Sequence, residues 1–210
     1  MKKFVISLLS VIFLCAAATA QVLVGMTDTT AYFPQLEGRR VAVLANHTAV
    51  ARFGDGAPGV AADAAVRLPG AASDGTIHLV DLLHGRGFDV TGIFSPEHGF
   101  RGTADAGEHV ASSVDAATGI PIRSLYDGNT KRPSDEAMRS FDVLVVDMQD
   151  VGLRFYTYYI TMLRMMDACA ESGRSVIVLD RPNPNGHHGD GPVRDMKYKS
   201  GVGALPIPVL

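Results

Sequence analysis

This sequence has few cysteines and no extended run of basic residues, and each absence excludes some classes of protein to which it could belong. Lysine and arginine together number 19 against 22 acidic residues, which gives a formal net charge of −3 and an isoelectric point near 6.1. Proteins that bind nucleic acid or an anionic membrane surface usually present a concentrated positive field, which this composition does not supply. We therefore expect no nucleic-acid partner.

Only two cysteines occur, Cys15 and Cys169, and the first lies in an N-terminal apolar segment that we expect to be removed. With Cys169 alone left, no intramolecular disulfide can form even in an oxidising compartment. Stability must then come from a packed core. Residues 21–210, in a chain with 47% hydrophobic residues, are enough for one domain with a buried interior.

The N-terminal apolar segment has the pattern of a secretory signal peptide. Lys2 and Lys3 precede an apolar stretch at 4–14, and Ala18-Thr19-Ala20 precedes Gln21. The segment is too short for a good membrane span, and small residues before the expected cut are typical of leader processing. Lipid attachment at Cys15 is disfavoured because Leu14 is bulkier than such processing prefers. We expect a leader at 1–20, export to the periplasm or the cell exterior, and no stable membrane insertion of the mature chain.

Three common motifs of α/β enzymes are missing. No G-x-G-x-x-G follows the first apolar run after the leader, and no G-x-x-x-x-G-K-[ST] or G-x-S-x-G occurs. These motifs bind dinucleotides, cradle phosphates and present a nucleophilic serine, respectively. We therefore expect no cofactor, and the chemistry is left to carboxylates, histidines, arginines and asparagines.

What the sequence does contain is a set of four short apolar runs, each followed by polar, chemically capable residues. The runs are 41–45, 90–94, 143–146 and 176–179, and they lead into Asn46-His47, Ser95–His98, Asp147–Asp150 and Asp180–Asn183. Runs rich in valine, isoleucine and leucine are typical of buried parallel strands. An open parallel sheet binds its ligand beyond the carboxyl ends of its strands. The pattern thus predicts a site along one edge of the sheet.

Helical patterns between these runs predict an α/β fold. We expect strands at 40–45, 89–94, 142–147 and 175–180, an extended segment at 120–125, and helices at 77–84, at 135–140 and from Phe155 up to Gly173, which terminates the last one, with loops at 54–73 and 181–192. Strands that alternate with helices are joined by right-handed crossovers. The expected architecture is a Rossmann-like, mostly parallel sheet with helices on both faces.

Three longer motifs carry a specific resemblance. They are SPEHGFRG at 95–102, DMQDVGLRFYTY at 147–158, and LDRPNPNG at 179–186 followed by Asp190-Gly191-Pro192. In this order they resemble the bacterial exo-β-N-acetylmuramidase family (NamZ type), from about Gly38 to Leu210. The resemblance implies enzymes that remove N-acetylmuramic acid from the non-reducing ends of peptidoglycan fragments. It also implies a Rossmann-like N-terminal domain, a smaller C-terminal domain and a site in the cleft between them.

Two departures from the family pattern shape the expectation. The sequence ends at Leu210, where relatives continue into the C-terminal domain, so we expect only the N-terminal part and half of the cleft. Residues 51–74 look like an insertion, either a lid or a surface loop. An alternative function is a truncated, non-catalytic muropeptide-binding fragment. Its uncovered face would be apolar and would promote self-association.

Glycosidic cleavage gives the motifs a chemical task, because the leaving oxygen needs a proton and the anomeric carbon needs a nucleophile or an activated water. Within the resemblance, Glu97 is the candidate acid, held in a partly desolvated cleft; a glutamate at a helix N-terminus is the structural alternative. Asp190 ranks first as the second carboxylate. Asp147 and Asp150 are further candidates, and Asp147 and Asp180 are equally well explained as caps of turns.

The expected substrate-binding residues fall into three groups. Asn46, His47 and His98 suit hydrogen bonds to sugar hydroxyls or to the acetamido group. Arg101, Arg154 and Arg181 suit a two-pronged contact with the lactyl carboxylate of muramic acid, and ion pairs with Asp147, Asp150 or Asp180 are the competing interpretation. Asp150, Tyr156 and Asn183 complete the predicted site; packing is the alternative for the tyrosines Tyr156 and Tyr158. The expected partners are N-acetylmuramyl-N-acetylglucosamine (MurNAc-GlcNAc) and other muropeptides.

A metal-dependent hydrolase is a minor alternative. Six residues form a possible divalent-metal set: His47, Glu97, His98, Asp147, His187 and His188. Their spacing matches no compact ligand motif such as H-E-x-x-H, so we expect no metal site. The two chemistries differ in one respect: a chelator would abolish metal-dependent activity and leave two-carboxylate chemistry unchanged.

Overall fold

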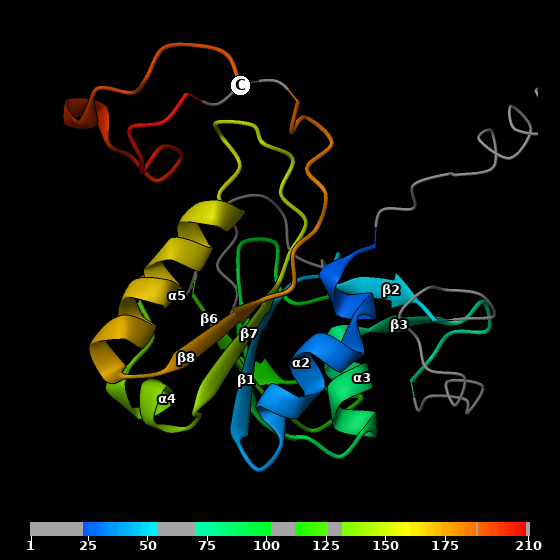
Figure 1. Ribbon diagram of the computed structural model, residues 1–210. Coiled ribbons are helices and arrows are strands. Elements are labelled where there is room, and N and C mark those ends of the chain that lie inside the picture. Colours follow the sequence, from blue (N-terminus) through cyan, green and yellow to red (C-terminus); the bar gives the residue numbers. More distant parts are fainter. Residues whose placement is uncertain (1–22, 54–69, 102–111, 126–131, 188, 209–210) are drawn as a thin grey trace, which may run out of the picture.

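The computed structural model describes residues 23–53, 70–101, 112–125, 132–187 and 189–208 (Figure 1). The expected leader at 1–20, most of the expected insertion at 51–74, and His188 lie outside the described residues. Within these ranges, none of the helices has the length and apolar character needed to cross a bilayer.

A six-stranded sheet lies at the centre of the molecule, with strand order β5-β6-β4-β1-β7-β8 (Figure 1). Its strands are β1 (Arg40–Ala45), β4 (Asp89–Ser95), β5 (Ser113–Val114), β6 (Pro121–Ser124), β7 (Val143–Asp147) and β8 (Ser175–Val178). Neighbouring strands pair in parallel, except that β5 is antiparallel to β6. The predicted mostly parallel α/β sheet is confirmed.

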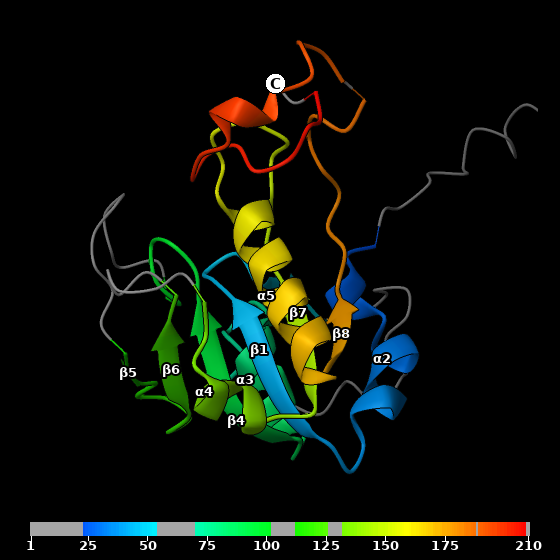
Figure 2. The same cartoon turned by 90° about the vertical axis from the view of Figure 1, so that its left-hand side faces the viewer.

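The central strands are buried on both faces, which explains their continuous apolar runs. Val41 and Val43 of β1 join one hydrophobic cluster, and Ala42 and Leu44 of the same strand join the other. The first cluster contains side chains of α2 (Thr29–Leu36) and α3 (Leu79–Gly85), and the second contains side chains of α4 (Asp135–Arg139) and α5 (Tyr158–Ser172). Figures 1 and 2 show these two pairs of helices on opposite faces of the sheet.

The three predicted helices are present, and two of them start later than predicted. Helix α4 begins as expected, because the Ser134 hydroxyl accepts a hydrogen bond from the Ala137 amide. Helix α5 begins at Tyr158, three residues after the predicted start, because the chain from Asp147 first forms a loop. It ends at Ser172, where Gly173 adopts the left-handed conformation with φ of 64°.

The prediction of a helix from residue 77 is wrong at its first two residues. Strand β3 (Thr76–His78) pairs with β2 (Val50–Arg52) in a separate two-stranded antiparallel sheet. Helix α3 starts after it, where the Val80 amide donates to Nδ1 of His78. The sequence patterns predicted neither this pair of strands nor α2, nor the short 3-10 helix η1 (Gly25–Thr27).

The two ends of the described chain approach the carboxyl edge of the sheet. The Gly25 amide donates to the carbonyl of Asp180 at 2.7 Å, and Met26 is fully buried. After β8 the chain rises past the carboxyl ends of the strands, and Figure 2 shows its last part, with the 3-10 helix η3 (Met196–Tyr198), above the N-terminal end of α5. This last part of the chain, residues 189–208, which we call the tail, therefore lies at the same edge of the sheet as the motif residues.

Candidate active site

The motif residues gather at one edge because their strands are neighbours. Strands β4, β1, β7 and β8 lie side by side in parallel, so the residues that follow them emerge at the same edge of the sheet. Asn46 follows β1, Glu97 follows β4, Asp150 follows β7 and Arg181 follows β8. The predicted position of the site is thus the position at which these side chains meet.

Glu97 lies half-buried in a turn after β4, and no helix of the described chain starts there. The Thr157 hydroxyl donates to Oε2 of Glu97 at 2.7 Å and joins the first motif to the second. His98, the next residue, has φ of 67°, a conformation that non-glycine residues seldom adopt. Glu97 and His98 line a cavity of about 260 Å³ with Phe155, Tyr156, Thr157 and Tyr158, which we call the Glu97 cavity.

Tyr158 stands in the middle of the candidate site and is 8% exposed. Burial raises the pKa of its phenol; Asn46 beside the hydroxyl lowers it, and the charges of Tyr156, Glu97 and Asp150 raise it further. The pKa of this one hydroxyl is therefore influenced by groups that follow β1, β4 and β7. This cluster is the convergence that the strand pattern predicted.

Asp150 lines a second cavity of about 190 Å³, which we call the Asp150 cavity. Its Oδ1 accepts a hydrogen bond from the Gly152 amide at 2.8 Å. Its Oδ2 is buried and has no hydrogen-bond partner among the described residues. Gly152 has φ of 70°, and a Cβ there would collide with the Asn183 side-chain amide, so the second and third motifs pack directly together.

Arg181 forms a buried ion pair with Asp147, which has no exposed surface. Its Nε and Nη2 donate to the two carboxylate oxygens, and Nη2 also donates to the carbonyl of Val50 at 3.1 Å. Burial raises the pKa of Asp147, and Arg181 opposes that shift. The two-pronged contact that was one interpretation of Arg181 is thus made to Asp147, as the ion-pair interpretation has it.

Arg101 is likewise engaged with carboxylates. Its guanidinium contacts Asp81 of α3 at 3.2 Å and Asp115 at 3.0 Å, and it lies over the ring of Phe100. Burial raises the pKa of Asp115, but hydrogen bonds from Arg101 and Thr118 reverse the shift and bring that pKa below its usual range. Arg101 therefore forms ion pairs as well, but its partners are Asp81 and Asp115 rather than the predicted Asp147, Asp150 or Asp180. These contacts hold the turn after Glu97 onto α3 and the loop before β6.

The remaining predicted residues are placed as follows. Arg154 donates to the carbonyl of Pro192 at 3.3 Å, so it links the second motif to the tail. His47 is exposed beyond β1, whereas Tyr156 lines the Glu97 cavity. Asp190 is exposed, accepts from the Gly191 amide within its own turn, and is not among the described residues that line the Glu97 cavity or the Asp150 cavity.

Sequence reasoning missed two threonines that organise the site. Thr48 donates through both its amide and its hydroxyl to Oδ1 of Asn46, at 3.0 and 2.6 Å, and its hydroxyl accepts from the Gln149 amide. It therefore braces the ends of β1 and β7 against each other. Thr157, the partner of Glu97, is inside the second motif, and its place there was the available signal.

The set of possible metal ligands does not come together in the described part of the chain. Across those residues, no group of three or more histidine, cysteine, aspartate or glutamate side chains is arranged to hold an ion. His188, one member of the set, lies outside the described residues.

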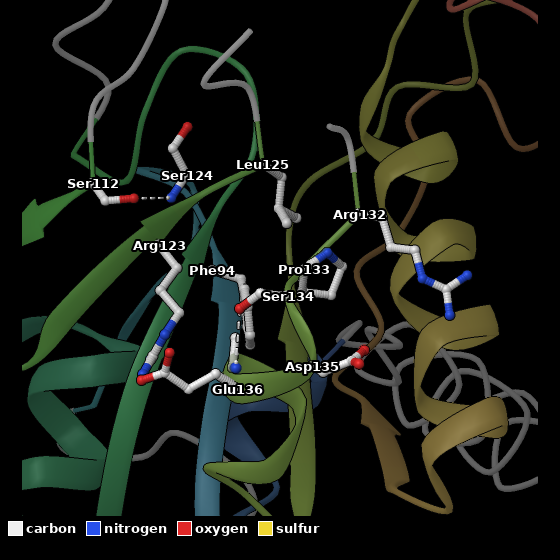
Figure 3. Close-up of a pocket in the computed structure, with 11 residues that line it drawn as sticks. Phe94, Ser112, Arg123, Ser124, Leu125, Arg132, Pro133, Ser134, Asp135 and Glu136 are labelled. Atoms are coloured by element: carbon white, nitrogen blue, oxygen red, sulfur yellow. Dashed lines mark hydrogen bonds between the residues drawn. The ribbon is translucent and has the colours of Figure 1, made fainter. Parts of the chain in front are cut away.

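A third cavity, of about 590 Å³, lies beside β6 and α4 and contains none of the predicted site residues (Figure 3). Ser112, Arg123, Ser134 and Glu136 are among the residues that line it, and the Glu136 side chain points toward the Arg123 guanidinium (Figure 3). Arg123 packs against Gly92, where a Cβ would collide with its guanidinium, and its Nη1 is buried with no hydrogen-bond partner in the described ranges. This cavity is separate from the cluster around Tyr158.

Comparison with known proteins identifies the family. The family model described as "Exo-beta-N-acetylmuramidase NamZ, N-terminal" matches residues 60–210, which is most of the chain. The chain belongs to this family. It is also 48% identical over 132 residues to the peptidoglycan beta-N-acetylmuramidase NamZ of Bacillus subtilis strain 168, a match that covers 62% of this chain and 32% of that protein.

Two solved structures of DUF1343 family proteins from Bacteroides fragilis resemble this chain. The first, at 48% identity and a TM-score of 0.69, covers 90% of this chain and 43% of the solved chain. The second, at 34% identity and the same TM-score, covers 88% and 41%. The chain therefore spans about a third of the curated relative and about two fifths of each solved structure, as the predicted N-terminal-only match requires.

Proposed function

We propose that this NamZ N-terminal domain bears the catalytic acid of an exo-β-N-acetylmuramidase, a glycoside hydrolase that releases N-acetylmuramic acid from the non-reducing end of peptidoglycan fragments in cell-wall turnover or recycling. The observation that carries the proposal is the placement of Glu97. It lies half-buried at the carboxyl edge of the sheet, held by Thr157 in a cavity built entirely from motif residues. Family membership supports the same chemistry.

The proposed role of Glu97 is to protonate the glycosidic oxygen as its bond to the anomeric carbon breaks. Asp190 remains our proposed second carboxylate, from its place in the third motif. The Asp190→Asn variant tests that role: activity should fall as far as in Glu97→Gln. Activity at the wild-type level in Asp190→Asn would remove Asp190 from the mechanism.

Recognition of the lactyl carboxylate is proposed for Arg154. Arg154 belongs to the second motif, next to the aromatic residues that line the Glu97 cavity, whereas the guanidinium groups of Arg101 and Arg181 bind carboxylates. Asn46, His47, His98 and Tyr156 are proposed to contact the rest of the sugar. The expected substrates are MurNAc-GlcNAc and other muropeptides that end in N-acetylmuramic acid.

The test is release of free N-acetylmuramic acid from MurNAc-GlcNAc by residues 21–210, with Glu97→Gln as the matched control. Release that disappears in the control supports the proposal and shows that the N-terminal part suffices for turnover. Binding of the sugar without release by well-folded protein instead supports the non-catalytic, muropeptide-binding alternative. Neither binding nor release would overturn the proposed function.

The proposed setting is outside the cytoplasm. The leader pattern at 1–20 and a peptidoglycan substrate both fit export to the periplasm or the cell exterior. N-terminal sequencing of the protein recovered from its native host tests this: a mature start at Gln21 supports cleavage, and an intact Met1 contradicts it.

A further inference from the structure

Two polar groups belong to residues that line the Asp150 cavity. One is Oδ2 of Asp150, which is buried and has no hydrogen-bond partner within the described ranges, and the other is the Tyr158 hydroxyl, whose hydrogen-bonding neighbour is the Asn46 side chain. A buried carboxylate oxygen without a donor costs free energy. The cavity thus offers one strong acceptor and one donor.

Both groups are held in position by their neighbours. The Gly152 amide fixes the other oxygen of Asp150 at 2.8 Å. Asn46, itself fixed by two hydrogen bonds from Thr48, lies beside the Tyr158 oxygen as a donor, which leaves the Tyr158 O–H to donate to a ligand. The donor and the acceptor are therefore set in place before a ligand arrives.

The charge and size of the cavity select the ligand group. Its volume of about 190 Å³ admits a substituent rather than a whole sugar, and Met148, Met162 and Val178 give it apolar walls. Arg181 is the cation among its described lining residues, and Asp147 already binds that guanidinium. A carboxylate would meet Asp150 and Asp180 with no cation left to pair it. A small uncharged group with an N–H donor, a carbonyl acceptor and an apolar end fits instead.

We propose that the Asp150 cavity is the binding site for the acetamido group of an N-acetylated sugar. The amide N–H donates to Oδ2 of Asp150, the amide carbonyl accepts from the Tyr158 hydroxyl, and the methyl group packs against Met148 and Met162. This inference rests on the proposed function, because it assumes that the ligand is the sugar whose glycosidic bond Glu97 protonates.

Tyr158 also lines the Glu97 cavity, so the two cavities share a wall. The acetamido group is attached to the carbon next to the anomeric carbon. A sugar anchored through that group in the Asp150 cavity therefore presents its glycosidic oxygen on the side of Tyr158 where Glu97 lies. The contacts of Asp150 and Tyr158 with the acetamido group, which we call the clamp, would set both the specificity for N-acetyl sugars and the position of the scissile bond.

The experiment measures binding of two ligands by residues 21–210 with ligand-observed NMR. The ligands are N-acetylmuramic acid and 3-O-lactyl-glucose, which has a hydroxyl in place of the acetamido group. The variants are Asp150→Asn, which still accepts from the Gly152 amide but turns an N–H toward the ligand, and Tyr158→Phe. The matched controls are Asp180→Asn and Tyr159→Phe, which line the same cavity without a part in the proposed contacts.

We expect Asp150→Asn to weaken N-acetylmuramic acid binding about tenfold or more, and Tyr158→Phe several-fold, with affinity for 3-O-lactyl-glucose unchanged. The acetyl methyl should receive the strongest saturation transfer. Wild-type affinity of both variants for N-acetylmuramic acid would overturn the clamp and leave the proposed function standing. Absence of N-acetylmuramic acid binding by the folded wild-type protein would overturn both.

Discussion

At the scale of single residues, the site depends on how a few side chains are held. Thr157 is the hydroxyl partner of Glu97, and it stands at the N-cap position of α5 without capping the helix through its side chain. The hydroxyl serves the carboxylate rather than the helix. Thr157 is accordingly a positioning residue in the proposed mechanism.

This role can be separated from simple packing by two substitutions. Thr157→Val keeps the shape and removes the donor, so we expect kcat for release of N-acetylmuramic acid to fall about tenfold with little change in KM. Thr157→Ser keeps the donor and should retain near-wild-type kcat. Steady-state kinetics on MurNAc-GlcNAc check this, and equal rates in both variants would show that the hydrogen bond does not matter.

The buried ion pair between Asp147 and Arg181 predicts a stability effect. Removing Arg181 leaves a carboxylate with no exposed surface unpaired, and breaking a buried pair in this way costs about 3–5 kcal/mol. We expect Arg181→Met to lower the free energy of unfolding by that amount in urea denaturation. The double variant Asp147→Asn/Arg181→Met should recover much of the loss, because it leaves no unpaired charge; no recovery would contradict this account.

At the scale of elements, the two edges of the sheet are held differently. At the amino edge, the Asp142 carboxylate accepts hydrogen bonds from the backbone amide and the guanidinium of Arg40, where β1 and β7 begin. Arg174 forms an ion pair with the same carboxylate. These contacts, led by the Arg40 hydrogen bonds, lower the pKa of Asp142 to about 2. The carboxyl edge instead carries the motif residues and the cavities.

The lowered pKa of Asp142 predicts how stability depends on pH. Since the folded-state pKa lies below the ordinary value of 3.8, the ionised carboxylate favours the folded state. That contribution is fully present above pH 4 to 5 and is lost as the pH falls through 3.8 toward 2. Urea midpoints measured between pH 2 and 7 should show a smaller decline in Asp142→Asn than in the wild type. Parallel declines would refute the assignment.

The sequence patterns predicted the large elements and missed the small ones for physical reasons. Strands β1 and β7 were evident because burial on both faces demands a continuous apolar run. Strands β2 and β3 have three residues each and pair across a long connection, so neither shows a periodicity of its own. Helix α2 has Pro34 in its interior and no side-chain N-cap, which removes the usual signals of a helix.

The same limit applies to the site. Which strand ends converge follows from the order of parallel strands, and so the region was predictable. The partner of each arginine was not, because Arg101, Arg154 and Arg181 occupy similar motif positions and differ only in where their side chains point. Likewise, the partnerless oxygen of Asp150 results from a turn at Gly152 that no spacing rule reveals.

At the scale of the whole molecule, several exposed apolar residues of the described surface lie on β8, in the second motif and in the C-terminal part of the chain. Val178 on the edge strand β8 is 47% exposed, Phe155 is 64% exposed, and Val193, Tyr198 and Val202 of the tail are exposed as well. Strand β8 also has no further strand beside it in the described sheet. Exposed apolar side chains beside a free strand edge favour contact with another chain.

We therefore expect residues 21–210 to self-associate as the concentration rises. Light scattering coupled to size exclusion should show an apparent mass above that of the monomer at high concentration. Val178→Lys, which places a charge on the edge strand, should restore the monomer. A wild-type protein that stays monomeric at all concentrations tested would show that this surface does not mediate self-association.

The contact between Gly152 and Asn183 has a consequence for how this domain can vary. Any side chain at position 152 displaces the amide of Asn183, and the two segments it joins are 31 positions apart. A substitution in one segment that alters this contact therefore also disturbs the packing of the other segment. In a library that varies positions 152 and 183 together and is screened for sugar binding, position 152 should accept glycine alone wherever Asn183 is kept, and any other residue at 152 should occur only with a change at 183.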